Sequence, residues 1–301
     1  MKGRRRGSPR AMTTKGLDSW IRKTARRVAA VAVLAAVLAL AGCGAGPAAR
    51  IRPPSTTGQP YLRYYAQADG FAVWVVNGAY VRENLDEEFT NFGQHLNFRF
   101  IPAGEFWLDE ENAPGEERFF IDHLLIENKV MARGVAYDKA LDEADAVEKT
   151  ERDKTLRAKE AEELAKSGRP DDLLRKVHKE LLTEFSADVK VWVVDGELVR
   201  DFFFIDFTEG GHDKVYKFVP AGEVWLDDDV NPAERKFILL HELHERALMA
   251  RGWPYARAHR DSSRIEYESR RDPALLDAAL QAEVKNNSYL TLTSVRTRKN
   301  L

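Results

Sequence analysis

The apolar and polar positions of the chain follow the same order twice. The apolar run 73–76, followed by Asn77-Gly78, recurs as 191–194 followed by Asp195-Gly196, at an offset of 118 residues. The same offset aligns further pairs of segments, namely 81–82 with 199–200, 89–90 with 207–208, 102–109 with 220–227, and 131–134 with 249–252. Matches at one fixed offset are the mark of a repeat architecture, and they indicate an internal duplication of a module of about 80 residues.

Each copy is predicted to begin with short strands. An apolar run that ends in Asn-Gly or Asp-Gly, followed by a second short run, is a strong β-hairpin signal. Two more strands are expected in each copy, at 96–101 and 105–108 in the first and at 214–219 and 223–226 in the second. The first half of each module is thus expected to be antiparallel β-structure.

Helices are predicted to follow the strands. The segment 231–234, Asn-Pro-Ala-Glu, combines an N-cap residue, a proline at the first helical position and a glutamate at the capping-box position. This helix should continue to about Arg251 and be closed by Gly252. A second helix is expected to begin near Tyr255, as it does near Tyr137 in the first copy.

The stretch between the copies is dense in charged residues and alanine. Residues 138–166 are expected to form a long solvated helix, which 167–170 would break before another helix over 171–184. The predicted fold is α+β, with two tandem modules of antiparallel β-hairpins followed by two helices, joined by a charged helical linker. The expected boundaries are 71–150 for module 1, 151–188 for the linker, 189–272 for module 2, and 273–301 for a C-terminal helix and tail.

A histidine and a glutamate lie four residues apart on the main helix of each copy, within an otherwise apolar stripe. They are His123 and Glu127 in module 1, and His241 and Glu245 in module 2. A buried carboxylate is costly unless it is paired or bound to a metal ion. The spacing places the two side chains side by side, where one cation could join them.

A glycine-flanked histidine precedes each of these helices. His95 matches His212 if the copies are shifted by one residue, and an acid, Glu88 or Asp206, precedes each histidine. Two histidines and a glutamate are a common ligand set for zinc or iron. The expected ligands of a divalent metal ion are His212, His241, Glu245 and His259 in module 2, and His95, His123 and Glu127 in module 1. The alternatives are a buried His–Glu hydrogen bond in the core, with the loop histidine simply exposed, and a coincidence of residue types.

The helix of module 2 carries a further acid. Residues 241–245, His-Glu-Leu-His-Glu, resemble the helix of the zincin metallohydrolases, in which the glutamate beside the first histidine polarises a metal-bound water. The resemblance covers five residues and implies that Glu242 acts as general base. It departs from the zincin pattern because Glu245 stands where that family has its second histidine, so His259 on the next helix would be a further ligand.

Module 1 lacks these additional features. Leu124 replaces Glu242, and Leu141 stands at the place of His259. Any chemistry is therefore expected in module 2, with module 1 as its degenerate partner.

Charge separates a basic leader from an acidic body. Residues 1–42 hold ten basic residues and one acidic residue, and removing them from the totals of 46 and 48 leaves 36 basic and 47 acidic residues, a net charge of −11. An acidic body argues against a nucleic-acid partner, whose binding needs a positive surface. The chain is 44% hydrophobic and 31% charged, which excludes a disordered or fibrous protein. Its single cysteine excludes a disulfide framework within the chain.

The leader predicts export and anchoring. A basic region is followed by the unbroken apolar run 28–41, which is the pattern of a secretory signal and is short for a membrane span. Residues 40–43, Leu-Ala-Gly-Cys, resemble the lipobox of bacterial lipoproteins, which implies cleavage after residue 42 and acylation of Cys43. Two or more acyl chains give stable anchoring. Residues 43–70 are expected to be a flexible tether.

Two functions are compatible with these observations. The first is a bacterial cell-envelope protein, lipid-anchored in the outer membrane and facing the periplasm if the cell is Gram-negative. Its duplicated modules would form a binding or scaffolding unit that contains a divalent metal ion and contacts the membrane and an envelope protein. The alternative is a metal-dependent hydrolase or peptidase of zincin-like type that acts through the helix of module 2.

Overall fold

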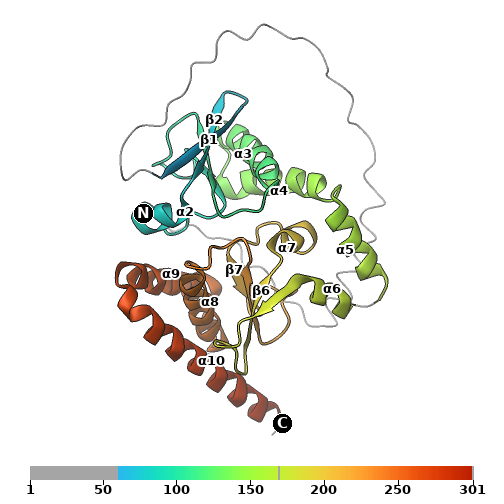
Figure 1. Cartoon of the computed structure of the whole chain (residues 1–301), viewed down its shortest axis with the longest axis vertical. Coiled ribbons are helices and arrows are strands. Elements are labelled where there is room, and N and C mark those ends of the chain that lie inside the picture. Colours follow the sequence, from blue (N-terminus) through green and yellow to red (C-terminus); the bar gives the residue numbers. More distant parts are fainter. Residues whose placement is uncertain (1–59, 169, 300–301) are drawn as a thin grey trace.

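The computed structural model describes residues 60–168 and 170–299. The leader, Cys43 and the first part of the expected tether lie outside these residues. The chain folds into two similar α+β modules, each built on a four-stranded mixed sheet (Figure 1). The duplication and the α+β fold expected from the sequence are confirmed. No helix in the described part of the chain combines the length and apolar character that a membrane span requires.

The two sheets have the same topology. The strands of module 1 are β1 (Tyr61–Ala68), β2 (Phe71–Val76), β3 (Phe92–Gln94) and β4 (Glu105–Asp109), in the order β1-β2-β4-β3. Those of module 2 are β5 (His178–Leu181), β6 (Lys190–Val194), β7 (Gly210–His212) and β8 (Glu223–Asp227), in the order β5-β6-β8-β7. In both sheets the central pair is parallel and the outer pairs are antiparallel.

Helices occupy equivalent places in the two modules. Module 1 contains α2 (Gly78–Asn84), α3 (Glu117–Met131) and α4 (Tyr137–Arg152), and module 2 contains α7 (Gly196–Phe202), α8 (Arg235–Ala250) and α9 (Tyr255–Arg271). The connection is formed by α5 (Leu156–Lys166) and α6 (Pro170–Val177), and the chain continues through a short 3-10 helix, Pro273–Leu275, into α10 (Leu276–Lys299). The helices expected to begin at Tyr137 and Tyr255 are confirmed.

The Asn-Gly and Asp-Gly pairs do not form hairpin turns, and that prediction is wrong. Asn77 and Asp195 instead cap α2 and α7, each side-chain oxygen accepting the backbone N–H three residues on. Gly78 is required because a Cβ there would lie 1.7 Å from Oδ2 of Asp109. Since β2 and β4 run parallel, the chain must cross over between them, and α2 begins that crossover.

The first strand of each module was not predicted, because its residues were expected to form a tether or a helix. Strand β1 lies within the expected tether and β5 within the expected helix 171–184, of which only α6, up to Val177, forms. The turn at Asp69-Gly70 has positive φ at both residues, 43° and 89°, which suits a tight hairpin between β1 and β2. Module 1 therefore begins ten residues earlier than expected, at Tyr61.

Three further boundaries differ from expectation. The strands predicted at 96–101 and 214–219 lie at 92–94 and 210–212 instead. The predicted helix 138–166 is interrupted, because Thr155 caps the start of α5 through its side chain. The main helix of module 2 starts after Glu234, and the Asn231 side chain caps only the preceding turn.

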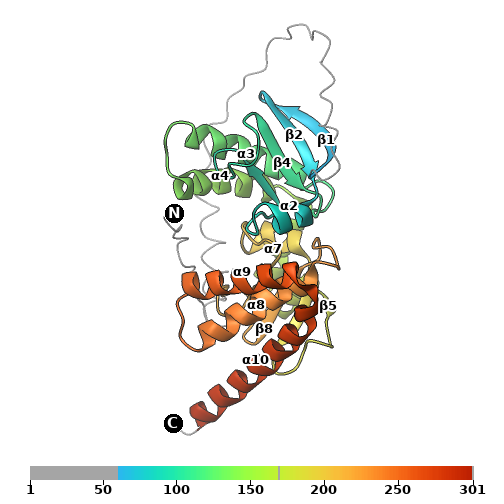
Figure 2. The same ribbon diagram turned by 90° about the vertical axis from the view of Figure 1, so that its left-hand side faces the viewer.

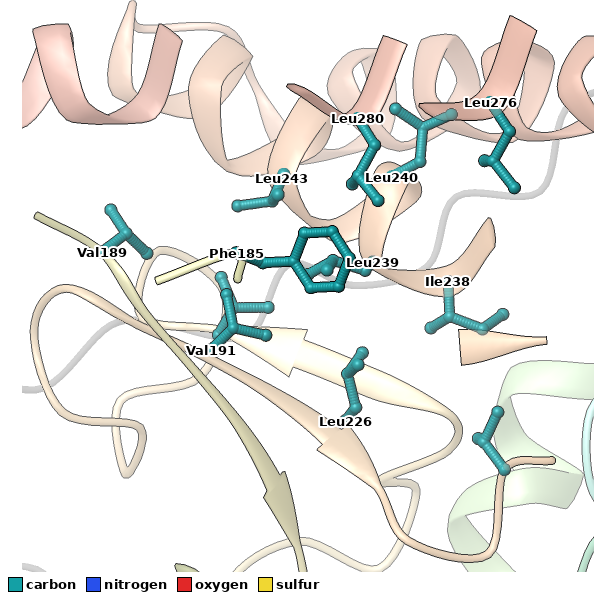
Figure 3. Close-up of a cluster of buried hydrophobic side chains, with 12 residues drawn as sticks. Phe185, Val189, Val191, Leu226, Ile238, Leu239, Leu240, Leu243, Leu276 and Leu280 are labelled. Carbon is teal, nitrogen blue, oxygen red and sulfur yellow. The ribbon is translucent and has the colours of Figure 1, made fainter. Parts of the chain in front are cut away.

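Both faces of the second sheet are covered. On one face, Val191 and Leu226 pack against Ile238 and Leu243 of α8 and Leu280 of α10 (Figure 3). On the other face, Trp225 packs against side chains of α5, α6 and α7. Each fully buried aliphatic or aromatic side chain contributes about 1.5–3 kcal/mol. This packing fixes α8 on the sheet and thereby places its polar residues.

The two modules are joined by reciprocal ion pairs. Arg82 of α2 lies 3.5 Å from Glu234 at the start of α8, and Arg200 of α7 lies 3.0 Å from Glu116 at the start of α3. The residues of each pair are related to those of the other by the offset of 118. Helix α2 of module 1 also lies against α9 of module 2 (Figures 1 and 2). The modules therefore pack as a pseudo-two-fold pair.

Candidate metal centre

A cavity of about 90 Å³ lies where module 1 meets α8 and α9 of module 2. Its walls come from three parts of the chain. Helices α8 and α9 contribute His241, Glu242, Glu245, His259, Ser263 and Glu266. Strand β7 and the segments on either side of it contribute Thr208, Glu209, Gly210 and Tyr216, and module 1 contributes Glu87 and Glu88. The cavity thus gathers the expected acid and imidazole groups of module 2 and adds carboxylates from module 1.

His241 is held in one tautomer by a residue of the neighbouring helix. Its Nδ1 lies 2.9 Å from Oε2 of Glu266 on α9. Burial alone would raise the pKa of Glu266, but the hydrogen bond and charge of His241, together with Arg270, hold it below its usual range. The ionised carboxylate can only accept a hydrogen bond, so Nδ1 carries the proton. The lone pair of Nε2 is therefore available, and it faces His259.

His259 is oriented by module 1 through its Nε2, whereas His241 is oriented through its Nδ1. Its Nε2 lies 3.3 Å from Oε2 of Glu88, a residue of module 1. Its Nδ1 lies 3.0 Å from Oε2 of Glu245 and 3.1 Å from Nε2 of His241. Burial opposes the charged form of His259, but hydrogen bonds to Glu245 and Glu88 raise its pKa to about 10. Its ring also stacks on Tyr255, with centroids 5.4 Å apart.

Three potential ligand atoms therefore converge. The separations are 3.1 Å between His241 Nε2 and His259 Nδ1, 3.0 Å between His259 Nδ1 and Glu245 Oε2, and 4.0 Å between His241 Nε2 and Glu245 Oε2. Ligands at 2.0–2.1 Å from a tetrahedral ion are about 3.3 Å apart. The arrangement can accept one divalent ion with small side-chain movements. Without an ion, a proton on His259 Nδ1 has two acceptors within reach, Glu245 Oε2 and His241 Nε2.

His212, expected as a ligand, lies with Glu242 and Glu245 in a second group whose potential ligand atoms are all within 4.8 Å of one another. Its Nδ1 accepts the backbone N–H of Lys214 at 3.1 Å, so its other ring nitrogen, Nε2, carries the proton. That Nε2 donates to Oε1 of Glu245 at 3.1 Å. In this tautomer His212 orients the carboxylate of Glu245, and its Nε2 carries a proton that points at Glu245. His212 is also fully buried, which contradicts the alternative in which the loop histidine is simply exposed.

Glu245 is held as a carboxylate by the two histidines. Burial would raise its pKa, but hydrogen bonds from His212 and His259 lower it to about 2. One oxygen faces His212 and the other faces the convergence point described above. This carboxylate is therefore charged and aimed at the position that an ion would occupy.

Glu242 lines the same cavity. It packs against Gly210, where a Cβ would lie 3.2 Å from its Cγ. Burial raises the pKa of Glu242, and the nearby His212 opposes that shift. A carboxylate with a raised pKa beside a metal position can accept a proton from water near neutral pH.

Module 1 keeps only part of this arrangement. His123 donates from Nδ1 to Oε2 of Glu148 at 2.8 Å, as His241 does to Glu266. Its Nε2 lies 3.6 Å from Oε2 of Glu127. Leu141 takes the place of His259, so the third ligand is missing. Among the described residues, the clusters of three ligand atoms near this interface are in module 2.

The residue equivalent to His212 in module 1 is Gln94, not His95. Gln94 pairs with Phe106 in its sheet as His212 pairs with Val224, which is the offset of 118 without a shift. Gln94 Nε2 donates to Oε1 of Glu127 at 2.7 Å, the same bond that His212 makes to Glu245. His95 bonds instead to the carbonyl of Ile101, so the structure does not bring it to His123 and Glu127.

Three residues of the cavity were assigned no role from the sequence. They are Glu88, Tyr216 and Glu266. Tyr216 could have been found, because Phe98 occupies the equivalent place in module 1 and only the hydroxyl differs. Together with Glu242 and His259, it makes the cavity polar where module 1 is apolar.

Comparisons of the chain with protein-family models, curated proteins and solved structures gave no match. The function of the site is therefore inferred from the positions of its side chains alone.

Proposed function

We propose that module 2 binds one divalent ion, zinc or iron, through His241, His259 and Glu245. The observation that carries this proposal is the convergence of three atoms, His241 Nε2, His259 Nδ1 and Glu245 Oε2, within 3.0–4.0 Å of one another. Each of the three side chains has its other polar atom bonded to a separate partner. Two imidazoles and a carboxylate suit both metals.

The protein that carries this site is proposed to be a lipid-anchored envelope protein of bacteria. The support is the basic and apolar leader followed by Leu-Ala-Gly-Cys at 40–43. The duplicated modules would serve as a metal-containing binding or scaffolding unit on the membrane. An acidic body of net charge −11 favours partners other than nucleic acid.

Metal analysis of the purified protein tests the site. One zinc or iron per chain is expected, and His259→Leu, which installs the residue of module 1, should abolish it. His95→Gln is the matched control and should leave the metal content unchanged. Wild-type protein without a stoichiometric metal, both as purified and after incubation with zinc or ferrous ion, would exclude the proposal.

Hydrolysis is the second candidate function, and the position of Glu242 favours it. A bound divalent ion would supply Lewis acidity, and Glu242 would accept the proton of a water that attacks a peptide or ester carbonyl. Tyr216, on the wall of the same cavity, would offer a hydroxyl to the substrate.

Glu242→Gln separates the two functions. A hydrolase should lose its turnover of a peptide library while it keeps its metal, because the substitution removes the proton acceptor without touching the three ligands. A binding protein should show no turnover in either form.

A further inference from the structure

We propose that Glu88 of module 1 is a positioning residue for the metal centre of module 2, so that module 2 binds the ion and module 1 orients one of its ligands, His259. This inference rests on the proposed metal site. It concerns a carboxylate that is not a ligand and that belongs to the other half of the chain.

Glu88 bridges two residues of α9. Its Oε2 lies 3.3 Å from Nε2 of His259, and its Oε1 accepts a hydrogen bond from Oγ of Ser263 at 3.0 Å. These residues are 171 and 175 positions away in the sequence. Both oxygens of one side chain therefore contact the opposite module.

The loop that carries Glu88 is fixed at both of its ends. The fully buried Phe89 anchors it in the core of module 1. On the other side, Arg82 of α2 lies 3.1 Å from Glu209 and 3.5 Å from Glu234, both of module 2. The loop is therefore anchored in module 1 and follows a helix that is ion-paired to module 2.

The effect of Glu88 on His259 follows from the two tautomers of imidazole. Glu245 lies 3.0 Å from Nδ1 of His259 and by itself favours a proton on Nδ1, which would block the lone pair needed by an ion. Glu88 favours a proton on Nε2 and so leaves Nδ1 free. A carboxylate on the outer nitrogen of a ligating histidine also raises the basicity of the ligand.

The equivalent contact, from an acid of module 2 to helix α4 of module 1, involves no histidine. Asp206 corresponds to Glu88, and Asp145 corresponds to Ser263. Burial and the neighbouring Asp206 raise the pKa of Asp145 to about 8. The acid of module 2 therefore reaches α4 of module 1 as Glu88 reaches α9, but Leu141 offers it no ring nitrogen.

Zinc affinity measured by competition with a chelator tests this role. Glu88→Ala should weaken zinc binding by about 10–100-fold, the usual effect of removing a partner of a ligating histidine. Glu87→Ala is the matched control, because Glu87 lines the same cavity without a bond to His259. The absorption spectrum of the cobalt-substituted protein should change in Glu88→Ala and not in the control. Equal affinity and an unchanged spectrum in Glu88→Ala would overturn the proposal.

A second measurement needs no metal. In chelator-treated protein, Glu88→Ala should lower the melting temperature of the wild type by more than it does in a His259→Leu background, where only the hydrogen bond from Ser263 is lost. Equal losses in both backgrounds would show that the two side chains do not interact, and would overturn the proposal. If this coupling is present but the wild type binds no metal, the contact stands and the proposed metal function fails.

Discussion

Arg200 and Glu116 form a fully buried ion pair between the two modules, with Nε and Oε2 separated by 3.0 Å. Arg200 also bonds to Asp229 in its own module. Its guanidinium is thereby surrounded by carboxylates, and these raise its pKa against the opposing effect of burial. The equivalent pair is Arg82, 118 residues before Arg200, and Glu234, 118 residues after Glu116.

Replacing Arg200 by Met should destabilise the protein strongly. Loss of one partner leaves buried carboxylates without a counter-charge, which costs about 3–5 kcal/mol in the free energy of unfolding. Urea denaturation measures this change. Arg157→Met is the control, because Arg157 is half-exposed and lies 3.6 Å from Glu197, so its removal should cost at most about 1 kcal/mol. Equal losses for the two variants would contradict the assignment of the interface.

Metal-free protein should lose stability as the pH rises above neutrality. Hydrogen bonds to carboxylates, acting against burial, raise the pKa of His123 and His259 to about 10. A folded-state pKa above the unfolded value of about 6.5 gives stability that is complete below pH 6.5 and is lost as the pH rises through 10. Melting temperatures of chelator-treated protein between pH 6 and pH 10.5 measure this loss. A flat profile would contradict these two shifts.

Metal binding should follow the opposite trend. His259 must lose a proton before its Nδ1 can bind an ion, so zinc affinity should rise over the same pH range. At a free zinc concentration one hundred times the Kd, the ion should add about 2.7 kcal/mol to the free energy of unfolding. The His259→Leu variant should gain no stability from zinc, and a similar gain there would point to binding elsewhere.

Leu141→His should create a second metal site. In module 1, His123 and Glu127 already face each other at 3.6 Å, and Asp206 lies beside Asp145, which is on the same helix as Leu141. The metal content should rise from one to two ions per chain. Val147→His, which adds a histidine at an exposed position of the same helix, should leave the content at one.

The repeat and its main helices could be predicted because they bury regular apolar patterns. The fixed offset of 118 and the spacing of His241 and Glu245 were enough to place the helix and its polar pair. Strand β1 could not be predicted in this way. Most of its residues are exposed at the edge of the sheet, so no alternation of apolar and polar positions marks it.

The composition of the site was only partly accessible from sequence. His95 was assigned to the place of His212 because the residue types agree, although the constant offset points to Gln94. The role of His212 depends on a backbone N–H that occupies its second nitrogen, and Glu88 contributes across 171 residues. Neither relationship leaves a pattern in a single sequence.

The pseudo-two-fold packing has a consequence for how such a site can diversify. In a symmetric dimer of identical modules, every substitution would appear in both sites at once. Covalent duplication removes that constraint, because Leu141 and His259 occupy equivalent positions but are encoded separately in one chain. One module can then lose a metal ligand and retain the residues that contact the other module. A single site in one module thus arises from a pair of modules with the same fold.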